Sequence, residues 1–182
     1  MKKVFLFLAE GFEETEAVAT LDILLRGGLD VTSVSITGNL LVAGAHGIAV
    51  NADTLFENAD ISSGDMLVLP GGMPGASNLK AYTGLKKALE QYAVNGKKIA
   101  AICAAPLVLG GLGLLQGKKA TAYPGYESTL KGATYVKSPV VKDGNIITGR
   151  GPGLVFDFGL AIVEELQGKA KAEEVAAGLL LK

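Results

Sequence analysis

The chain has 182 residues, a hydrophobic fraction of 49% and a formal net charge of −1 at pH 7. This size fits one domain with a substantial core, so we predict a single domain over residues 1–182. Its lysines are scattered rather than clustered, which argues against nucleic acid or a membrane surface as a partner, and no apolar run approaches the roughly 18 residues of a membrane span.

Apolar runs alternate with amphipathic segments along the chain. In order, they predict a strand over residues 4–9, a helix over 14–25, strands over 29–36 and 66–69, a helix over 79–93 and a strand over 98–102. Continuous apolar strands between amphipathic helices are typical of parallel strands covered on both faces. The pattern therefore predicts an α/β fold with a doubly wound, mostly parallel sheet.

Two segments interrupt this alternation. Residues 38–51 contain short strand-like runs, and residues 140–147 carry the Asp143 and Gly144 pair that is typical of a tight hairpin. We predict small antiparallel additions at both places. Residues 154–166 and 170–181 then predict two helices, each with an apolar face.

The single cysteine, Cys103, lies between the strand over residues 98–102 and a predicted helix in which Pro106 occupies the first turn. Backbone N–H groups at a helix N-terminus favour negative charge, so we expect the thiol pKa to be lowered from its usual value of about 8.5. The alternative is an ordinary buried cysteine that packs as a small hydrophobic residue. One cysteine cannot form an intrachain disulfide, which favours a reducing, cytoplasmic setting.

Ligands of open parallel sheets bind beyond the carboxyl ends of the strands. The loops after residues 4–9, 66–69 and 98–102 should therefore bring an acidic segment, the pair Gly71 and Gly72, and Cys103 together. The glycine pair would let backbone N–H groups hold an oxyanion, unless it is simply a tight turn.

Glu16 is the favoured carboxylate of the acidic segment, because it shares a helix face with Thr20 and Leu24, whereas Glu13 is expected to point outward. A buried glutamate beside a thiolate should stay protonated, donate a hydrogen bond to sulfur and carry protons. Glu16 and Cys103 would then titrate as a coupled pair.

Four ordered motifs resemble those of the ThiJ/PfpI superfamily, in the branch that contains the parkinsonism-associated protein deglycase and its bacterial relatives. They are residues 13–16, 69–72, 100–106, and 149–153 with the following segment 156–163. The resemblance spans nearly the whole chain and implies a flavodoxin-like fold and a homodimer. It also implies that Cys103 is the nucleophile, that Glu16 is hydrogen-bonded to it, and that backbone N–H groups of Gly72 and Ala104 surround a bound oxyanion.

Three positions depart from the superfamily pattern. Ala104 stands where protease-like members place a histidine, which disfavours peptidase activity. Tyr123 replaces a histidine of the deglycase branch, and because a phenol is a poor base at neutral pH, Glu16 would carry proton transfer alone. His46 falls where the branch often has an arginine near the partner subunit's site, or else it is a solvent-facing hairpin residue. One histidine and one cysteine cannot form a structural zinc site, so no metal is expected.

Three functions are compatible with these residues. The first is a cofactor-independent glyoxalase or deglycase, in which the Cys103 thiolate attacks a methylglyoxal-type 2-oxoaldehyde or its protein adduct and Glu16 carries the proton. The second is an oxidative-stress sensor or chaperone in which Cys103 is oxidised to a sulfinate. The third is a pocket that only binds a small metabolite, which the Tyr123 replacement keeps open.

Overall fold

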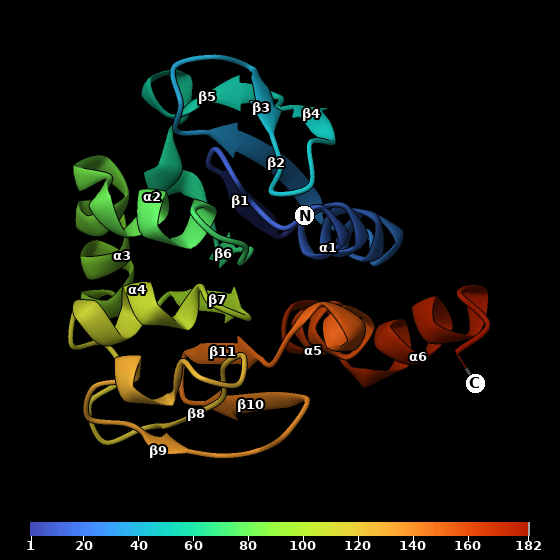
Figure 1. Cartoon of the computed structure of the whole chain (residues 1–182). Helices are drawn as coiled ribbons and strands as arrows, with labels where there is room; N and C mark the ends of the chain where they lie inside the picture. Colours follow the sequence, from blue (N-terminus) through green and yellow to red (C-terminus); the bar gives the residue numbers. More distant parts are fainter. Residues whose placement is uncertain (182) are drawn as a thin grey trace.

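The structure, a computed structural model, describes residues 1–181, and its centre is a seven-stranded sheet (Figure 1). The strand order is β10-β11-β7-β6-β1-β2-β5. Every neighbouring pair is parallel except the hairpin β10–β11. The strands are β1 (Lys3–Leu8), β2 (Asp30–Ser35), β5 (Thr54–Leu55), β6 (Met66–Leu69), β7 (Lys98–Ile102), β10 (Val140–Asp143) and β11 (Ile146–Gly149). The predicted α/β fold with a mostly parallel sheet is confirmed.

Helices cover both faces of the sheet (Figure 1). On one face lie α1 (Glu14–Arg26), α5 (Val155–Gln167) and α6 (Lys169–Gly178), and on the other lie α2 (Gly75–Ala81), α3 (Thr83–Val94) and α4 (Pro106–Gly111). Short 3-10 turns occupy Phe56–Asn58, Ile61–Ser63, Glu127–Thr129 and Pro152–Leu154. None of the helices within residues 1–181 combines the length and the apolar character that a bilayer span requires.

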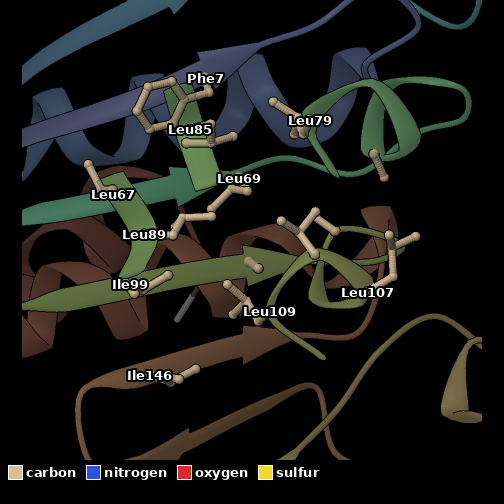
Figure 2. Packing of buried hydrophobic residues seen from close by; sticks show 14 of the residues in the cluster. Phe7, Leu67, Leu69, Leu79, Leu85, Leu89, Ile99, Leu107, Leu109 and Ile146 are labelled. Carbon is tan, nitrogen blue, oxygen red and sulfur yellow. The ribbon is translucent and has the colours of Figure 1, made fainter. Parts of the chain in front are cut away.

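The strands read as continuous apolar runs because both of their faces are buried. In β1, Val4 and Leu6 pack toward α1 and α5, whereas Phe5 and Phe7 pack into the opposite cluster. Figure 2 shows that second cluster, where strand side chains meet Leu85 and other leucines of the covering helices. The alternating side chains thus build one core on each face of the sheet.

The helix predicted over residues 79–93 is wrong as a single element, because α2 and α3 are separated at Tyr82. The backbone there is extended, with φ −72° and ψ 110°. The Tyr82 ring packs edge-on against Phe56 at 5.1 Å between centroids, and its hydroxyl donates to Glu57 Oε1 at 2.9 Å. A Cβ at Gly84 would lie 2.8 Å from the Phe56 ring. Contacts with residues 56 and 57 therefore outweigh the helical periodicity.

Both antiparallel additions are present, but only one joins the main sheet. The first is the hairpin of β3 (Leu41–Ala43) and β4 (Ala49–Asn51), which forms a separate two-stranded sheet above the end of β1 (Figure 1). The second is the hairpin β10–β11, at the sheet edge. A further parallel pair, β8 (Lys119–Ala120) with β9 (Thr134–Tyr135), was not predicted, because two-residue strands carry no alternation that a sequence can reveal.

Candidate active site

Cys103 occupies the turn between β7 and α4, with Pro106 as the first residue of the helix. Its N–H donates to the Gly149 carbonyl at 2.9 Å, and its carbonyl accepts from the Tyr123 N–H at 2.9 Å. These bonds hold the residue at φ +63°, in the left-handed region. That conformation costs a residue with a side chain about 1–2 kcal/mol. Strained turns from strand to helix are a known setting for exposed nucleophiles, and Cys103 remains 8% exposed.

Glu16 lies in the first turn of α1 and is fully buried. Its Oε2 accepts from the Gly71 N–H at 2.8 Å, while its Oε1 is buried with no hydrogen-bond partner within residues 1–181. Glu13, which was expected to point outward, instead caps the helix, because its Oε2 accepts from the Glu16 N–H at 2.7 Å. The cap satisfies a helix-end donor and fixes the turn that carries Glu16.

The glycine loop after β6 closes tightly over both side chains. A Cβ at Gly71 would lie 2.8 Å from Cys103 Cβ and 2.8 Å from Glu16 Oε2. Gly72 has φ +87°, and its Cβ would lie 2.3 Å from the Glu13 backbone nitrogen. The structure thus brings thiol, carboxyl and glycine loop into one cluster, with Ala104 following the thiol directly. No side chain larger than hydrogen fits in the loop at either glycine.

Cys103 and Glu16 shift each other's pKa. Burial raises the pKa of Glu16 to about 7, although the thiol and the Gly71 N–H favour its ionised form. Burial, followed by the Glu16 charge, raises the pKa of the Cys103 thiol, and the N–H groups of Ala104 and Gly72 oppose this only in part. The predicted lowering of the thiol pKa is therefore wrong in this closed geometry, because burial and a facing carboxylate outweigh the backbone dipoles.

The sequence predicts that the Glu16 carboxyl stays protonated, and this agrees with its raised pKa. The two groups face each other in a space that disfavours two negative charges. A proton on Glu16 removes the like charge, and because the thiol pKa is raised as well, the thiol keeps its own proton in this closed geometry.

His46 lies apart from this cluster, in the turn between β3 and β4. Its Nδ1 is 2.8 Å from Glu14 Oε2, and its N–H donates to Glu14 Oε1 at 2.6 Å. The Glu14 carboxylate raises the pKa of His46. The His46 side chain is 70% exposed, as the solvent-facing alternative expects, and its role toward a partner subunit stays a prediction.

Glu14 itself was missed by the sequence analysis. It is 6% exposed and holds the hairpin by accepting N–H groups of His46 and Ile48. One oxygen each of Glu14 and Glu13 and a ring nitrogen of His46 lie within 4.8 Å of one another and could ligate a cation, but hydrogen bonds to the hairpin already engage Glu14. The expected absence of a metal stays a prediction. No local pattern marks Glu14, because the hairpin that covers it comes about 30 residues later.

Tyr123 is joined to Cys103 through the backbone, because its N–H donates to the Cys103 carbonyl. Its side chain is 45% exposed, and its ring lies 3.1 Å from the position of a Cβ on Gly151. Together with Arg150 and Pro124 it lines a cavity of about 290 Å³. Arg150 lies in the motif over residues 149–153, but no function was predicted for it. The sequence feature that could have indicated one is its place directly after the buried strand β11, which pairs with β7, the strand that leads to Cys103.

Comparison with known proteins gives matches over nearly the whole chain. A sequence model described as the DJ-1/PfpI family matches residues 2–165. Protein DJ-1 homolog A of Arabidopsis thaliana is 45% identical over 100% of this chain, which spans about half of that relative, 47% of its length. The Caenorhabditis elegans protein named glutathione-independent glyoxalase DJR-1.2 is 32% identical, with 94% of this chain and 92% of that protein covered.

A solved structure is also similar to this chain over nearly its whole length. Oxidized Toxoplasma gondii DJ-1 superposes with a TM-score of 0.95 at 36% identity, and the match covers 99% of this chain and 98% of that one. Sequence and structural similarity thus extend together over the sheet, the helices and the loops around Cys103.

Proposed function

Because the chain belongs to the DJ-1/PfpI family, we propose that it is a cysteine-dependent glyoxalase that acts on methylglyoxal-type 2-oxoaldehydes or on their protein adducts. The observation that carries this proposal is that Cys103 and the buried Glu16 carboxyl lie on either side of Gly71, where a Cβ would be 2.8 Å from both Cys103 Cβ and Glu16 Oε2. The relative named as a glutathione-independent glyoxalase supports it.

The reaction begins when the Cys103 thiol passes its proton to the ionised Glu16 and the sulfur adds to the aldehyde carbon. The carbonyl electron pair moves to oxygen, where N–H groups of Gly72 and Ala104 stabilise the developing charge until Glu16 returns the proton to this oxygen and gives a hemithioacetal. Glu16 then takes the proton from the former aldehyde carbon and returns it to the adjacent carbon, which leaves a thioester. Water releases a 2-hydroxy acid and the free thiol. Substrate and water supply every atom, so no oxidant or cofactor is needed.

The pKa of Glu16 suits this role. A carboxyl with a pKa of about 7 is populated in both protonation states near neutral pH, so it can accept and return a proton within one turnover. An exposed glutamate with an ordinary pKa of about 4.3 would be almost fully ionised and a weaker base. Burial of Glu16 therefore supports general acid–base catalysis as well as a neutral partner for the thiol.

Glu16→Gln is expected to lower kcat for methylglyoxal by about 10²- to 10⁴-fold, the usual contribution of a positioned acid–base group. The amide keeps the size of the side chain but cannot shuttle a proton. Glu10→Gln is the matched control, because Glu10 is exposed in the loop after β1. Its kcat should equal that of the wild type. Lactate formation followed by ¹H NMR measures the rates, and full activity in Glu16→Gln would contradict the mechanism.

A second candidate function is oxidation sensing at Cys103, which the relative described as oxidized favours. Within residues 1–181 no second cysteine is present to trap a sulfenic acid as an intrachain disulfide. A peroxide could therefore transfer two oxygen atoms in succession, releasing one water or alcohol each time, and give a sulfinate. A protonated Glu16 would stabilise that anion by donating a hydrogen bond.

We also propose that the chain assembles as a homodimer. Exposed apolar side chains occur on α1 and on the hairpin that bridges Phe12 just before this helix, namely Val18, Leu25, Leu41 and Ile48. Sedimentation equilibrium should give about twice the chain mass of 18.7 kDa, and Ile48→Glu should shift the protein toward the monomer. A monomeric wild type would contradict this proposal.

A further inference from the structure

The cavity beside Tyr123 is lined by a cationic side chain, Arg150, that forms no ion pair within residues 1–181. Arg150 follows β11 directly and, with Tyr123, Pro124 and residues 151–154, lines a space of about 290 Å³. Its Nε is buried and has no hydrogen-bond partner within the same residues 1–181.

An unpaired buried donor on a charged group is costly. Arg150 as a whole is partly exposed, but its buried Nε has no acceptor in the described part of the chain, so a carboxylate, a phosphate or water beside it would satisfy this donor. The planar guanidinium fits the two oxygens of a carboxylate especially well. The space beside Arg150 therefore favours an anion.

Residues 151–154 border the cavity and lead into α5 through the 3-10 turn Pro152–Leu154. The Leu154 N–H donates to the Gly151 carbonyl and the Val155 N–H to the Pro152 carbonyl, so these donors are already engaged. Asp157 in the first turn of α5 is exposed and forms no ion pair with Arg150. The preference for an anion therefore rests on the guanidinium.

Backbone hydrogen bonds connect Cys103 to the segments that line the cavity. The carbonyl of Gly149, the residue before Arg150, accepts from the Cys103 N–H at 2.9 Å, and the Tyr123 N–H donates to the Cys103 carbonyl. Neighbouring parallel strands lie about 4.8 Å apart, so the backbone of Arg150 lies about one strand spacing from that of Cys103. The segments that line the cavity are thus neighbours of Cys103 in the backbone.

We propose that the Arg150 cavity is a subsite for a carboxylate at the far end of the substrate. The activity part of this inference rests on the proposed function, and it narrows the substrate class to 2-oxoaldehydes that carry a carboxylate a few carbons away. A suitable probe is 4,5-dioxopentanoate, and its methyl ester is the matched neutral compound. The carboxylate would pair with the guanidinium while the aldehyde carbon faces the Cys103 sulfur.

The preference for a carboxylate is tested by comparing kcat/KM for the acid and for its methyl ester. In the wild type, kcat/KM for the acid should exceed that for the ester by about 10- to 100-fold, the worth of a charge-assisted hydrogen bond. Arg150→Met should abolish this ratio, and Arg150→Lys, which keeps the charge without the planar fork, should retain part of it. Arg26→Met is the matched control, since Arg26 is exposed at the end of α1 and pairs with Asp22, and it should keep the full ratio. Equal use of acid and ester by the wild type would overturn the proposal.

A binding experiment separates the subsite from the reaction. Levulinate has the same carboxylate but no aldehyde, so it should shift the Arg150 Nε–H resonance saturably in the wild type and in Arg26→Met, whereas methyl levulinate should not. If no aldehyde is turned over but levulinate binds at Arg150, the proposed function fails and the subsite stands. If methylglyoxal is turned over but levulinate leaves the resonance unchanged, the subsite is overturned and the proposed function stands.

Discussion

Cys103→Ser is expected to reduce turnover of methylglyoxal by roughly a thousandfold or more, as is usual when a covalent nucleophile is removed. A serine hydroxyl fills nearly the same space, so the turn at φ +63° and the packing around Glu16 should persist. The hydroxyl is a far weaker acid than a thiol and adds poorly to the aldehyde. Lactate formation measures the loss, and thermal unfolding of both proteins checks that the fold is retained. Substantial turnover by Cys103→Ser would contradict the proposal that the Cys103 sulfur is the nucleophile.

The same variant tests the sensor candidate. After mild peroxide treatment, the wild type should gain two oxygen atoms at Cys103, and Cys103→Ser should not. Met1 and Met73 are exposed and can each gain one oxygen as a sulfoxide, so peptide mapping must locate the added mass. A thiol that stays unmodified would contradict oxidation sensing and leave the glyoxalase proposal standing.

Gly72→Ala is expected to lower the free energy of unfolding by about 3–5 kcal/mol. The alanine would have to adopt φ +87°, which costs about 1–2 kcal/mol, and its Cβ would meet the Glu13 backbone nitrogen at 2.3 Å and the Phe12 carbonyl carbon at 2.6 Å. Backbone atoms cannot swing aside as a flexible side chain does. The loop after β6 and the loop after β1 would therefore separate.

Gly113→Ala is the matched control for this effect. Gly113 has a similar φ of +72°, but nothing lies within 4 Å of its would-be Cβ. Only the backbone strain remains, so we expect a loss of about 1–2 kcal/mol. Urea unfolding measures both variants, and equal losses would show that the close approach at Gly72 contributes little.

Much of this architecture follows from periodicity. Strands buried on both faces require uninterrupted apolar residues, so β1, β6 and β7 are visible in the sequence. The choice of Glu16 could be made for a similar reason, because its spacing from Thr20 and Leu24 places it on the face of α1 that packs on the sheet. Such features depend on residues that are near one another in the chain.

Features that depend on distant residues were not predictable in this way. The break at Tyr82 arises from contacts with Phe56 and Glu57, and the burial of Glu14 arises from the hairpin that contains His46. The direction of the thiol pKa shift had the same origin, since it depends on how completely neighbouring loops cover the sulfur. In each case a local preference was outweighed by a partner that the sequence alone does not place.

At position 103 the left-handed backbone favours one residue for stability and another for reactivity. Glycine would adopt that conformation without steric cost, whereas every residue that brings a nucleophilic atom must accept the strain. Selection of variants for a higher melting temperature alone would therefore favour glycine at this position. Such a variant would keep the sheet, helices and loops but would lose the reactive thiol.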